Sequence, residues 1–272
     1  GTPIMEIAEK IEGEILKLGG RAAFPVTVSC DETAAHYSPL WEDKTIATGL
    51  VKVDFGVAIN GFVADNAVSF DLSPEKKHGV LIKAAETALK NAIEFIKEQK
   101  KNNKDVFLGE IGKKIQEAIT ISGFSPIINL SGHEISQYMV HSGLTIPNYN
   151  NSSRIKLKDG IYAIEPFATT GVGMVQDGSP SGIYELKKIS SVRDAFTREI
   201  FQFIQSEYKT MPFTIRWLVK KFGLRAILSL KSLEQQGCLH QFPQLVEKSR
   251  MPVSQAEKTI FVSGDKVIVL GG

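Results

Sequence analysis

Five side chains of the kinds that bind divalent metals lie in separate, strand-like stretches of the sequence, and they are Asp54, Asp65, His133, Glu165 and Glu257. Four carboxylates and one imidazole are hard enough, and numerous enough, to hold two divalent cations that share a water molecule. Such a pair of cations activates water for attack on a carbonyl group. The set therefore favours hydrolytic chemistry over a single structural metal.

The two aspartates fall on one predicted β-hairpin. Residues 51–70 form two β-rich runs that meet at Asn60-Gly61, a pair favoured in tight hairpin turns. On antiparallel strands joined in this way Asp54 and Asp65 can face each other, where they would repel unless a cation neutralised them. Each aspartate alone could equally be a turn residue at a strand end. The glutamates favour the metal interpretation, because they occupy apolar segments, YAIEPF and QAEKTIF, where an unpartnered carboxylate is costly.

Three histidines lie in or beside loops that follow predicted strands. His133, in LSGHEIS, comes just past a strand, where a lone histidine is more often a surface or core residue than a ligand. His36, in AAHYSP, and His141, in YMVHSGLTIPN, are candidates for a general acid or base, or for a group that orients substrate, because imidazole titrates near neutral pH. We assign no function to His78 or His240.

Periodicity, capping residues and turn residues predict the elements that must position these side chains. Helices are expected at 3–18, at 74–101 with Ser73 as N-cap and Pro74 at N1, and at 105–122. Strands and hairpins are expected at 23–29, 126–132, 160–175 and 256–270. Further amphipathic helices without candidate ligands, at 196–208, 213–223 and 224–237, indicate a helical insertion that splits the core.

The sequence also contains an internal repeat. KLGGRAAFPVTVS and TISGFSPIINLSG share a helix end, a glycine, a turn, a proline and an apolar strand, with Gly19 and Gly123 at the same point. Each copy is followed by a histidine-bearing loop and a carboxylate-bearing hairpin. We therefore predict an α+β fold with a pseudo-two-fold repeat, in which helices cover antiparallel sheets. The second copy has two helices before its strand and the first has one, so we expect an opening helix to be missing at the N-terminus.

Composition narrows the classes of function. The 272 residues carry 32 basic and 30 acidic side chains, a net charge of +2 that predicts neither DNA binding nor attraction to a membrane surface. The sequence has no apolar run of the ~20 residues that a membrane-spanning helix needs. Cys30 and Cys238 are far apart and lack a partner motif, which is typical of free thiols in a reducing cytoplasm.

Taken together, the motifs resemble methionine aminopeptidases of type II, the archaeal and eukaryotic class. The resemblance covers essentially the whole chain, and its segments are AFPVTVS, AAHYSP, VKVDFGVAINGFVAD, NLSGHEI, HSGLTIPN, AIEPFATTG and QAEKT. It implies the pita-bread fold of creatinases and aminopeptidases. It also implies a catalytic core formed by 1–190 and 251–272, interrupted by the helical, winged-helix-like type II insertion at 191–250.

The resemblance implies a role for each candidate metal ligand. Asp54 would bind one metal in bidentate fashion, and Asp65 and Glu257 would bridge the two metals. His133 and Glu165 would complete the second metal's ligands, and Glu165 would also shuttle a proton. The cofactors would be two divalent ions per chain, drawn from Co, Mn, Fe and Zn.

The resemblance also implies the substrate-binding residues. His141 would hydrogen-bond the scissile amide region and act in catalysis, and His36 would lie in the pocket near the substrate's amino end. Phe24, Val140 and Phe167 would line an apolar slot for the unbranched methionine thioether. Ordinary core packing is the competing interpretation of these three residues.

Three positions depart from the family pattern. Ala58 and Lys258 stand where relatives commonly have histidine, and Asn66 stands where they have threonine. None is a predicted ligand, although Asn66 follows Asp65 and could alter hydrogen bonding around the shared water. Lys258 should point to the face of its strand opposite that of Glu257.

The expected function is removal of the initiator methionine from nascent peptides with a small second residue, by a cytoplasmic, monomeric enzyme. Transient ribosome contact would rest on the basic stretches 97–104 and 216–225, which are otherwise solvated helix faces. One alternative is a proline dipeptidase or X-Pro aminopeptidase, although such enzymes usually carry a large N-terminal domain. Another is a non-enzymatic RNA- or ribosome-binding relative, although such proteins lose metal ligands and this chain has no concentrated basic patch.

Overall fold

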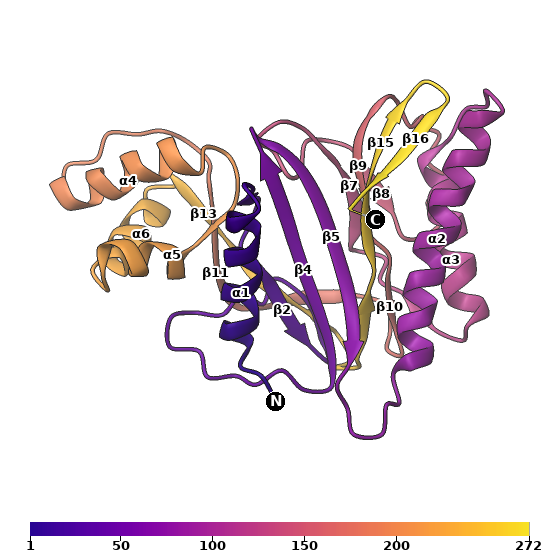
Figure 1. Ribbon diagram of the computed structural model, residues 1–272, viewed down its shortest axis with the longest axis horizontal. Helices are drawn as coiled ribbons and strands as arrows, with labels where there is room; N and C mark the ends of the chain where they lie inside the picture. Colours follow the sequence, from indigo (N-terminus) through magenta and orange to yellow (C-terminus); the bar gives the residue numbers. More distant parts are fainter. Residues whose placement is uncertain (272) are drawn as a thin grey trace.

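A large antiparallel sheet runs through the centre of the computed structural model, which describes residues 1–271 (Figure 1). Its strands are β1 (Arg21–Ala22), β2 (Thr27–Cys30), β4 (Leu50–Ile59), β5 (Phe62–Asp71), β7 (Ser131–Ile135), β8 (Thr145–Pro147), β9 (Gly160–Ile164), β15 (Glu257–Ser263) and β16 (Lys266–Leu270). Strands β5 and β15 are neighbours, so the sheet joins β1, β2 and β4 from the start of the chain to β9, β7 and β8 from its middle.

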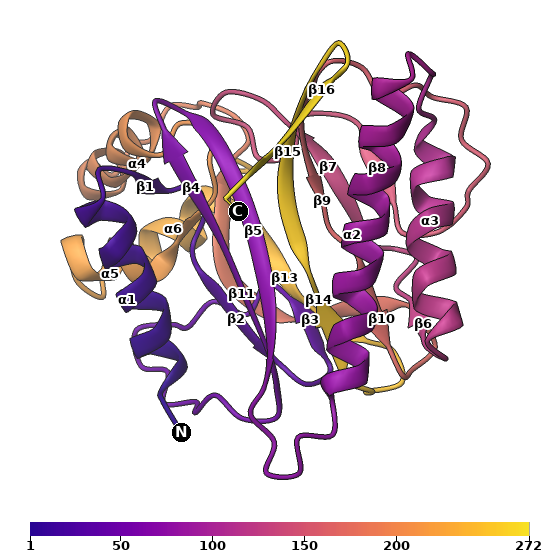
Figure 2. The ribbon, with the colours of Figure 1, turned by 45° about the vertical axis from the view of Figure 1, so that its right-hand side comes forward.

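Three helices pack on this sheet. Helix α1 (Ile4–Lys17) packs on β2 and β4, with Ile4 and Ala8 against Val51 and Val53. Helices α2 (Gly79–Lys101) and α3 (Leu108–Ile121) lie side by side over the other end of the sheet (Figure 2). Along α2 the buried positions are mostly alanines at helical spacing, which lets α2 approach its neighbours closely.

Two smaller sheets complete the architecture. One consists of β14 (Val253–Gln255), β10 (Phe167–Thr169) and β6 (Ser125–Pro126). The other contains β12 (Phe213–Thr214), β11 (Val175–Leu186), β13 (Leu239–Glu247) and β3 (Thr33–Ala35). Helices α4 (Ala195–Glu207), α5 (Ile215–Phe222) and α6 (Ala226–Gln235) share a separate apolar cluster beside this sheet, drawn in orange in Figure 1. None of the helices in residues 1–271 is long and apolar enough to cross a membrane.

Most of the predicted elements are confirmed. Helices 3–18 and 105–122 correspond to α1 and α3, and the three helices of the predicted insertion correspond to α4, α5 and α6. The Asn60-Gly61 turn joins β4 to β5 with both residues in the left-handed region, as a tight hairpin requires. Gly19 and Gly123 have φ values of 84° and 83°, so the two copies of the repeat share the left-handed conformation at this glycine. The α+β fold with antiparallel sheets under helices is confirmed.

The predicted start of the second helix is wrong. Helix α2 begins at Gly79, not at Pro74. Asp71 accounts for the difference, because its carboxylate accepts hydrogen bonds from the main chain and hydroxyl of Ser73 and from the main chain of His78. The residues between are held in a loop, and Lys76 has a φ of 50° that no α-helix accommodates.

The predicted hairpin at 160–175 is also wrong, because the chain changes sheets there. Strand β9 pairs with β7 and β15 in the large sheet, whereas β10 pairs with β14 and β6. The change occurs at Glu165-Pro166, where proline has no N–H to continue a ladder.

The strand predicted at 126–132 is displaced toward the C-terminus. His133 lies in the middle of β7 rather than after a strand. The preceding residues turn, because the Asn129 side chain hydrogen-bonds the main-chain N–H and carbonyl of Val175.

The predicted division into a core and an insertion stays a prediction. The stretch 191–250 contains α4, α5 and α6, but it also contains β13, which pairs with β11 and β3 from the predicted core. The helical cluster is thus continuous with a sheet that it shares with the rest of the chain.

Candidate metal centre

Strand register brings three of the candidate ligands to one face of the large sheet. Ala67 on β5 is the cross-strand partner of both Asp54 on β4 and Glu257 on β15. Asp65 lies two residues before Ala67 and therefore on the same face. Helix α1 packs on β4 residues of the opposite parity, Val51 and Val53, so the three carboxylates point away from that helix.

The other two candidates approach from β7 and β9. His133 pairs with Ala163 of β9, and Glu165 follows directly after β9. The His133 Nε2 atom lies 3.7 Å from Asp65 Oδ2. Potential ligand atoms of Asp65, His133 and Glu257 lie within 4.8 Å of one another, as do those of Asp54, Glu165 and Glu257. The five predicted residues therefore form two groups, and Glu257 belongs to both.

Burial sets the charge state of these carboxyl groups. It is the main cause that raises the pKa of Asp54 to about 7 and lifts the pKa values of Asp65, Glu165 and Glu257 well above their usual range. Repulsion among the neighbouring carboxylates raises the latter three further. Cations between the groups would remove this repulsion and favour the ionised forms.

Several carboxylate oxygens of the candidate ligands lack a hydrogen-bond partner in the described part of the chain, and this shows that the five residues fit divalent cations. Within residues 1–271, Asp54 Oδ1, Asp65 Oδ1 and both carboxylate oxygens of Glu257 are buried without a hydrogen-bond partner. Buried polar atoms are rarely left unsatisfied unless an ion or water binds them. Carboxylate oxygens with one imidazole suit a divalent cation, so the residues fit a metal site.

Two supporting residues were missed by sequence reasoning. The Gln255 side-chain amide donates to Glu165 Oε1 at 2.8 Å and to Asp54 Oδ2 at 3.3 Å, which links the two carboxylates. The Thr259 hydroxyl accepts from the Asp65 main-chain N–H at 2.7 Å and donates to the Asp65 carbonyl at 2.9 Å. Thr259 lies two residues after Glu257 on β15, so the alternation of a strand could have identified it, whereas Gln255 ends a different strand, β14.

Replacing Thr259 by valine should weaken metal binding about 10–100-fold, the usual effect of losing a residue that orients a ligand. Thr259 is fully buried, and valine would leave the Asp65 main chain without its partner where β5 and β15 meet. Titration calorimetry with Mn²⁺ would measure the change. Thr259→Ser keeps the hydroxyl and should bind metal as the wild type does. Equal affinity for all three proteins would exclude the orienting role.

The departures from the family pattern lie away from the candidate ligands. Lys258 and Asn66 are cross-strand partners on the face opposite Glu257 and Asp65, as expected for Lys258. The Lys258 amine donates to the main-chain carbonyl of Gly271. Ala58 is buried in an apolar cluster.

A cavity of about 460 Å³ opens beside the ligand groups. All of the predicted substrate-binding residues line it, together with four of the predicted ligands: Phe24, His36, Val140, His141, Phe167, Asp54, Asp65, His133 and Glu165. Sequence reasoning missed the contribution of the C-terminal third of the chain, namely Ile183, Pro212, Phe242 and Leu245. These apolar residues carry no motif, and only the fold brings them to the cavity.

The cavity histidines are neutral at neutral pH. Burial lowers the pKa of His36 to about 4, that of His133 to about 3, and that of His141 below its usual value. His36 Nδ1 lies 3.1 Å from the Pro243 carbonyl, which can only accept, so Nδ1 carries the proton and Nε2 remains an acceptor. The His141 ring lies 4.2 Å, centroid to centroid, from that of His133. His36 and His141 can therefore bind substrate through hydrogen bonds rather than through charge.

The chain is similar to known proteins both in sequence and in structure. No family model matches the sequence. The chain is 41% identical to the methionine aminopeptidase of Pyrococcus abyssi over 274 residues, which covers 99% of this chain and 90% of that protein. Among solved structures, a thermophilic Arx1 superposes with a TM-score of 0.79 at 16% identity, covering 100% of this chain and 84% of that one. The methionine aminopeptidase of Thermotoga maritima superposes with a TM-score of 0.66 at 20% identity, covering 99% and 86%. These two structures share the fold.

Proposed function

The chain belongs to the methionine aminopeptidase family, and from this premise we propose that it is a metal-dependent enzyme that removes N-terminal methionine from peptides with a small second residue. The observation that supports the proposal is the joining of two ligand groups through Glu257 beside an apolar cavity. The ligand groups suit hydrolysis, and the cavity suits an unbranched apolar side chain.

We propose that two divalent ions bind at these residues and share Glu257, with Asp54 on one ion and His133 on the other. Asp65, as the second bridging carboxylate, and Glu165, beside His133, would complete the ligands. Bound cations would lower the pKa of a water molecule and polarise the scissile carbonyl. The ligand chemistry suits Co, Mn, Fe or Zn, among which availability often decides. The Gln255 amide keeps Asp54 and Glu165 in place by donating to both.

The cavity residues provide recognition. Phe24, Val140 and Phe167 form the apolar slot that we assign to the methionine side chain. His36, with Nε2 as an acceptor, is suited to receive a hydrogen bond from the substrate's amino end. We assign His141, which lines the cavity, to hydrogen-bond the scissile amide. Glu165 lines the same cavity, and we assign it to carry a proton to the departing amine.

Replacing His141 by alanine should lower kcat by about 100-fold, because loss of one group that stabilises the transition state typically has such an effect. The KM should change much less. Phe167→Ala, which enlarges the slot, should mainly raise KM. Steady-state kinetics on a methionyl tripeptide would separate the two effects. An unchanged kcat for the His141 variant would remove this residue from the mechanism.

Peptide hydrolysis by metal-stripped protein, with and without added Mn²⁺ or Co²⁺, tests the proposed function. Met-Gly-Met-Met and an X-Pro dipeptide would be supplied side by side. Metal-dependent release of methionine alone is the expected result. Cleavage of X-Pro alone would establish the proline dipeptidase alternative. The absence of both metal binding and cleavage would support the non-enzymatic relative.

We also propose that the substrates are nascent polypeptides, met in the cytoplasm by a monomer that contacts the ribosome transiently. The basic stretch 97–104 supports ribosome contact, since its lysines cluster where α2 ends. Arg216, in the second basic stretch, is buried and therefore contributes nothing to such a surface. Co-sedimentation with ribosomes and light scattering would test the contact and the monomeric state.

A further inference from the structure

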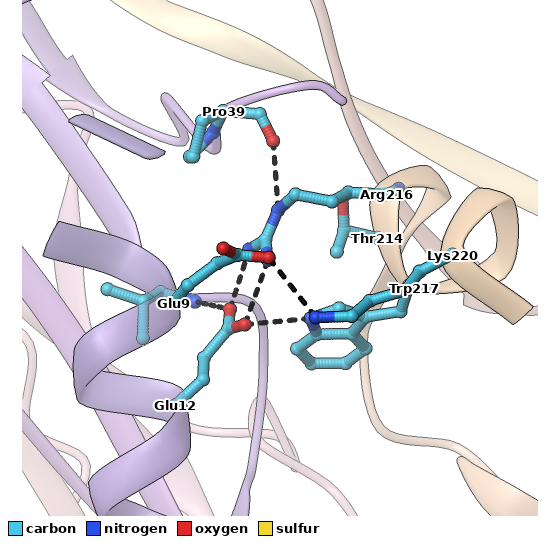
Figure 3. A network of polar contacts seen from close by, with 8 residues as sticks. Glu9, Glu12, Pro39, Thr214, Arg216, Trp217 and Lys220 are labelled. Carbon is cyan, nitrogen blue, oxygen red and sulfur yellow. Dashed lines mark hydrogen bonds and ion pairs between the residues drawn. The ribbon is translucent and has the colours of Figure 1, made fainter. Parts of the chain in front are cut away.

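A carboxylate outside the cavity, 13% exposed, connects several of the segments that form the cavity walls (Figure 3). Glu12 of α1 accepts hydrogen bonds from Arg216 Nη1 at 2.9 Å and Nη2 at 2.7 Å, a two-pronged ion pair. It also accepts from Trp217 Nε1 at 2.9 Å and from the main-chain N–H of Val26 at 3.3 Å. One carboxylate thus joins α1, α5 and the chain before β2.

Arg216 extends this connection to a further segment. Its Nε donates to the Pro39 carbonyl at 3.1 Å, and its side chain is 4% exposed. Pro39 belongs to the loop that begins with His36. The planar guanidinium therefore binds Glu12 through its two terminal nitrogens and binds the loop that begins with His36 through Nε.

Three of the four connected segments, all except α1, contribute a residue to the cavity wall. Phe24 lies two residues before Val26, His36 lies three residues before Pro39, and Pro212 lies four residues before Arg216. None of the three paired side chains, Glu12, Arg216 or Trp217, lines the cavity.

The helix that carries Arg216 is itself attached to the cavity wall. Thr214 is the N-cap of α5, and its hydroxyl accepts from the Arg216 main-chain N–H. Thr214 is also the cross-strand partner of Ile183, another wall residue. A shift of Arg216 would therefore be transmitted to Ile183 as well as to Pro212.

A buried ion pair at this place is better explained by geometry than by stability. Apolar residues of similar volume often stabilise a fold as well as a buried pair of charges does. A two-pronged pair, in contrast, fixes the distance and the angle between the elements that carry it. The residues joined here come from α1, α5 and two loops. The Val28 main-chain N–H donates to the Tyr37 carbonyl and so links the two loops to each other, but within residues 1–271 neither helix is strand-paired with them.

We propose that the Glu12–Arg216 ion pair is a positioning element for substrate binding, which sets the spacing of the Phe24, His36 and Pro212 walls around the N-terminal residue of the peptide. This inference rests on the proposed function, because it assigns the cavity to that substrate. The pair touches no reacting atom. Its loss therefore weakens substrate binding and leaves the chemical step intact.

The double variant Glu12→Met/Arg216→Met tests the proposal, because it removes both charges and leaves no unpaired ion in the interior. With Met-Gly-Met-Met and saturating Mn²⁺, we expect KM to rise about 10-fold or more while kcat stays within about 3-fold of wild type. Arg216→Lys retains the charge but loses the two-pronged contact with Glu12 and the hydrogen bond to Pro39. Its KM should therefore lie between that of the wild type and that of the double variant. Metal content and the circular dichroism spectrum would show that each variant is folded and loaded.

Lys220→Met is the matched control. Lys220 lies on the same helix as Arg216 and pairs with Glu9 of α1 at 3.4 Å, but the pair is exposed and touches no wall segment (Figure 3). Its KM should equal that of the wild type. A rise in KM equal to that of the double variant would show a general effect of loosening the contact between α1 and α5.

The results separate the two hypotheses. An unchanged KM in the folded, metal-loaded double variant overturns the positioning role, and so does a fall in kcat without a change in KM. If the double variant does not fold, a wild-type KM for Arg216→Lys overturns it instead. Absence of methionine release by the wild type would overturn the proposed function itself.

Discussion

Replacing Glu257 by glutamine is expected to remove both bound cations and nearly all methionine release. Glu257 is the residue that the two ligand groups share, and both of its oxygens are buried without a partner among the described residues. Glutamine keeps the shape but offers one neutral oxygen in place of two charged ones. We expect kcat/KM to fall by more than about 100-fold, beyond the ~10–100-fold that loss of an orienting residue costs.

Two further variants sharpen this experiment. Asp54→Asn alters a residue of one group only, and should leave about one cation bound where Glu257→Gln leaves none. Glu247→Gln is the control, because Glu247 is also fully buried but its carboxylate accepts hydrogen bonds from Val172, Ser249 and Met251. That variant should lose stability and keep its metals. Plasma mass spectrometry after dialysis would measure the number of cations bound by each of the three variants. Two retained cations in Glu257→Gln would refute the assignment of Glu257 as a ligand shared by both ions.

The stability of the wild type should rise with pH between about 7 and 10 relative to that of Lys52→Met. Lys52 is 1% exposed, and its amine donates to the main-chain carbonyls of Asp31 and Leu50 without a carboxylate partner. Burial lowers its pKa to about 7 from the 10.5 of a free lysine. Between these two values the unfolded chain holds a proton that the folded chain has released, so raising the pH favours folding.

Below pH 7 both states are protonated, and the wild type carries the full cost of a buried charge. The free energy of unfolding of the wild type should therefore gain roughly 1 kcal/mol per pH unit on that of the variant across this window. Urea denaturation at pH 7, 8 and 9 in the presence of a chelator would measure it. Lys266→Met, at an exposed position, is the control for the loss of one lysine. A flat difference for Lys52→Met would mean that its amine stays charged when buried.

The ligand set could be predicted from sequence because carboxylates in apolar, alternating segments are costly unless something binds them. Alternation also contains the signal for Thr259, two residues after Glu257 on the same strand. The Glu12–Arg216 pair could not be predicted in this way. A charged residue on an amphipathic helix looks the same in sequence whether it meets water or another charge.

Errors in the predicted elements have a similar physical origin. Ser73-Pro74 is a good local signal for a helix start, but Asp71 offers a competing set of hydrogen bonds. The stretch 160–175 has the pattern of a hairpin, yet each half finds better partners in a different sheet. In both places interactions with other residues outweigh the local preference.

The pairing of β5 with β15 has a consequence for how the protein matures. Asp65 and Thr259 are in contact although 194 residues separate them. Contacts of such separation form late, since closing a long loop costs entropy before any contact offsets it. During its own synthesis the chain therefore has an incomplete set of candidate ligands until β15, which begins at Glu257, has left the ribosome. A chain that stops before Glu257 lacks a residue of both ligand groups, so such a fragment should not hold the proposed metal ions.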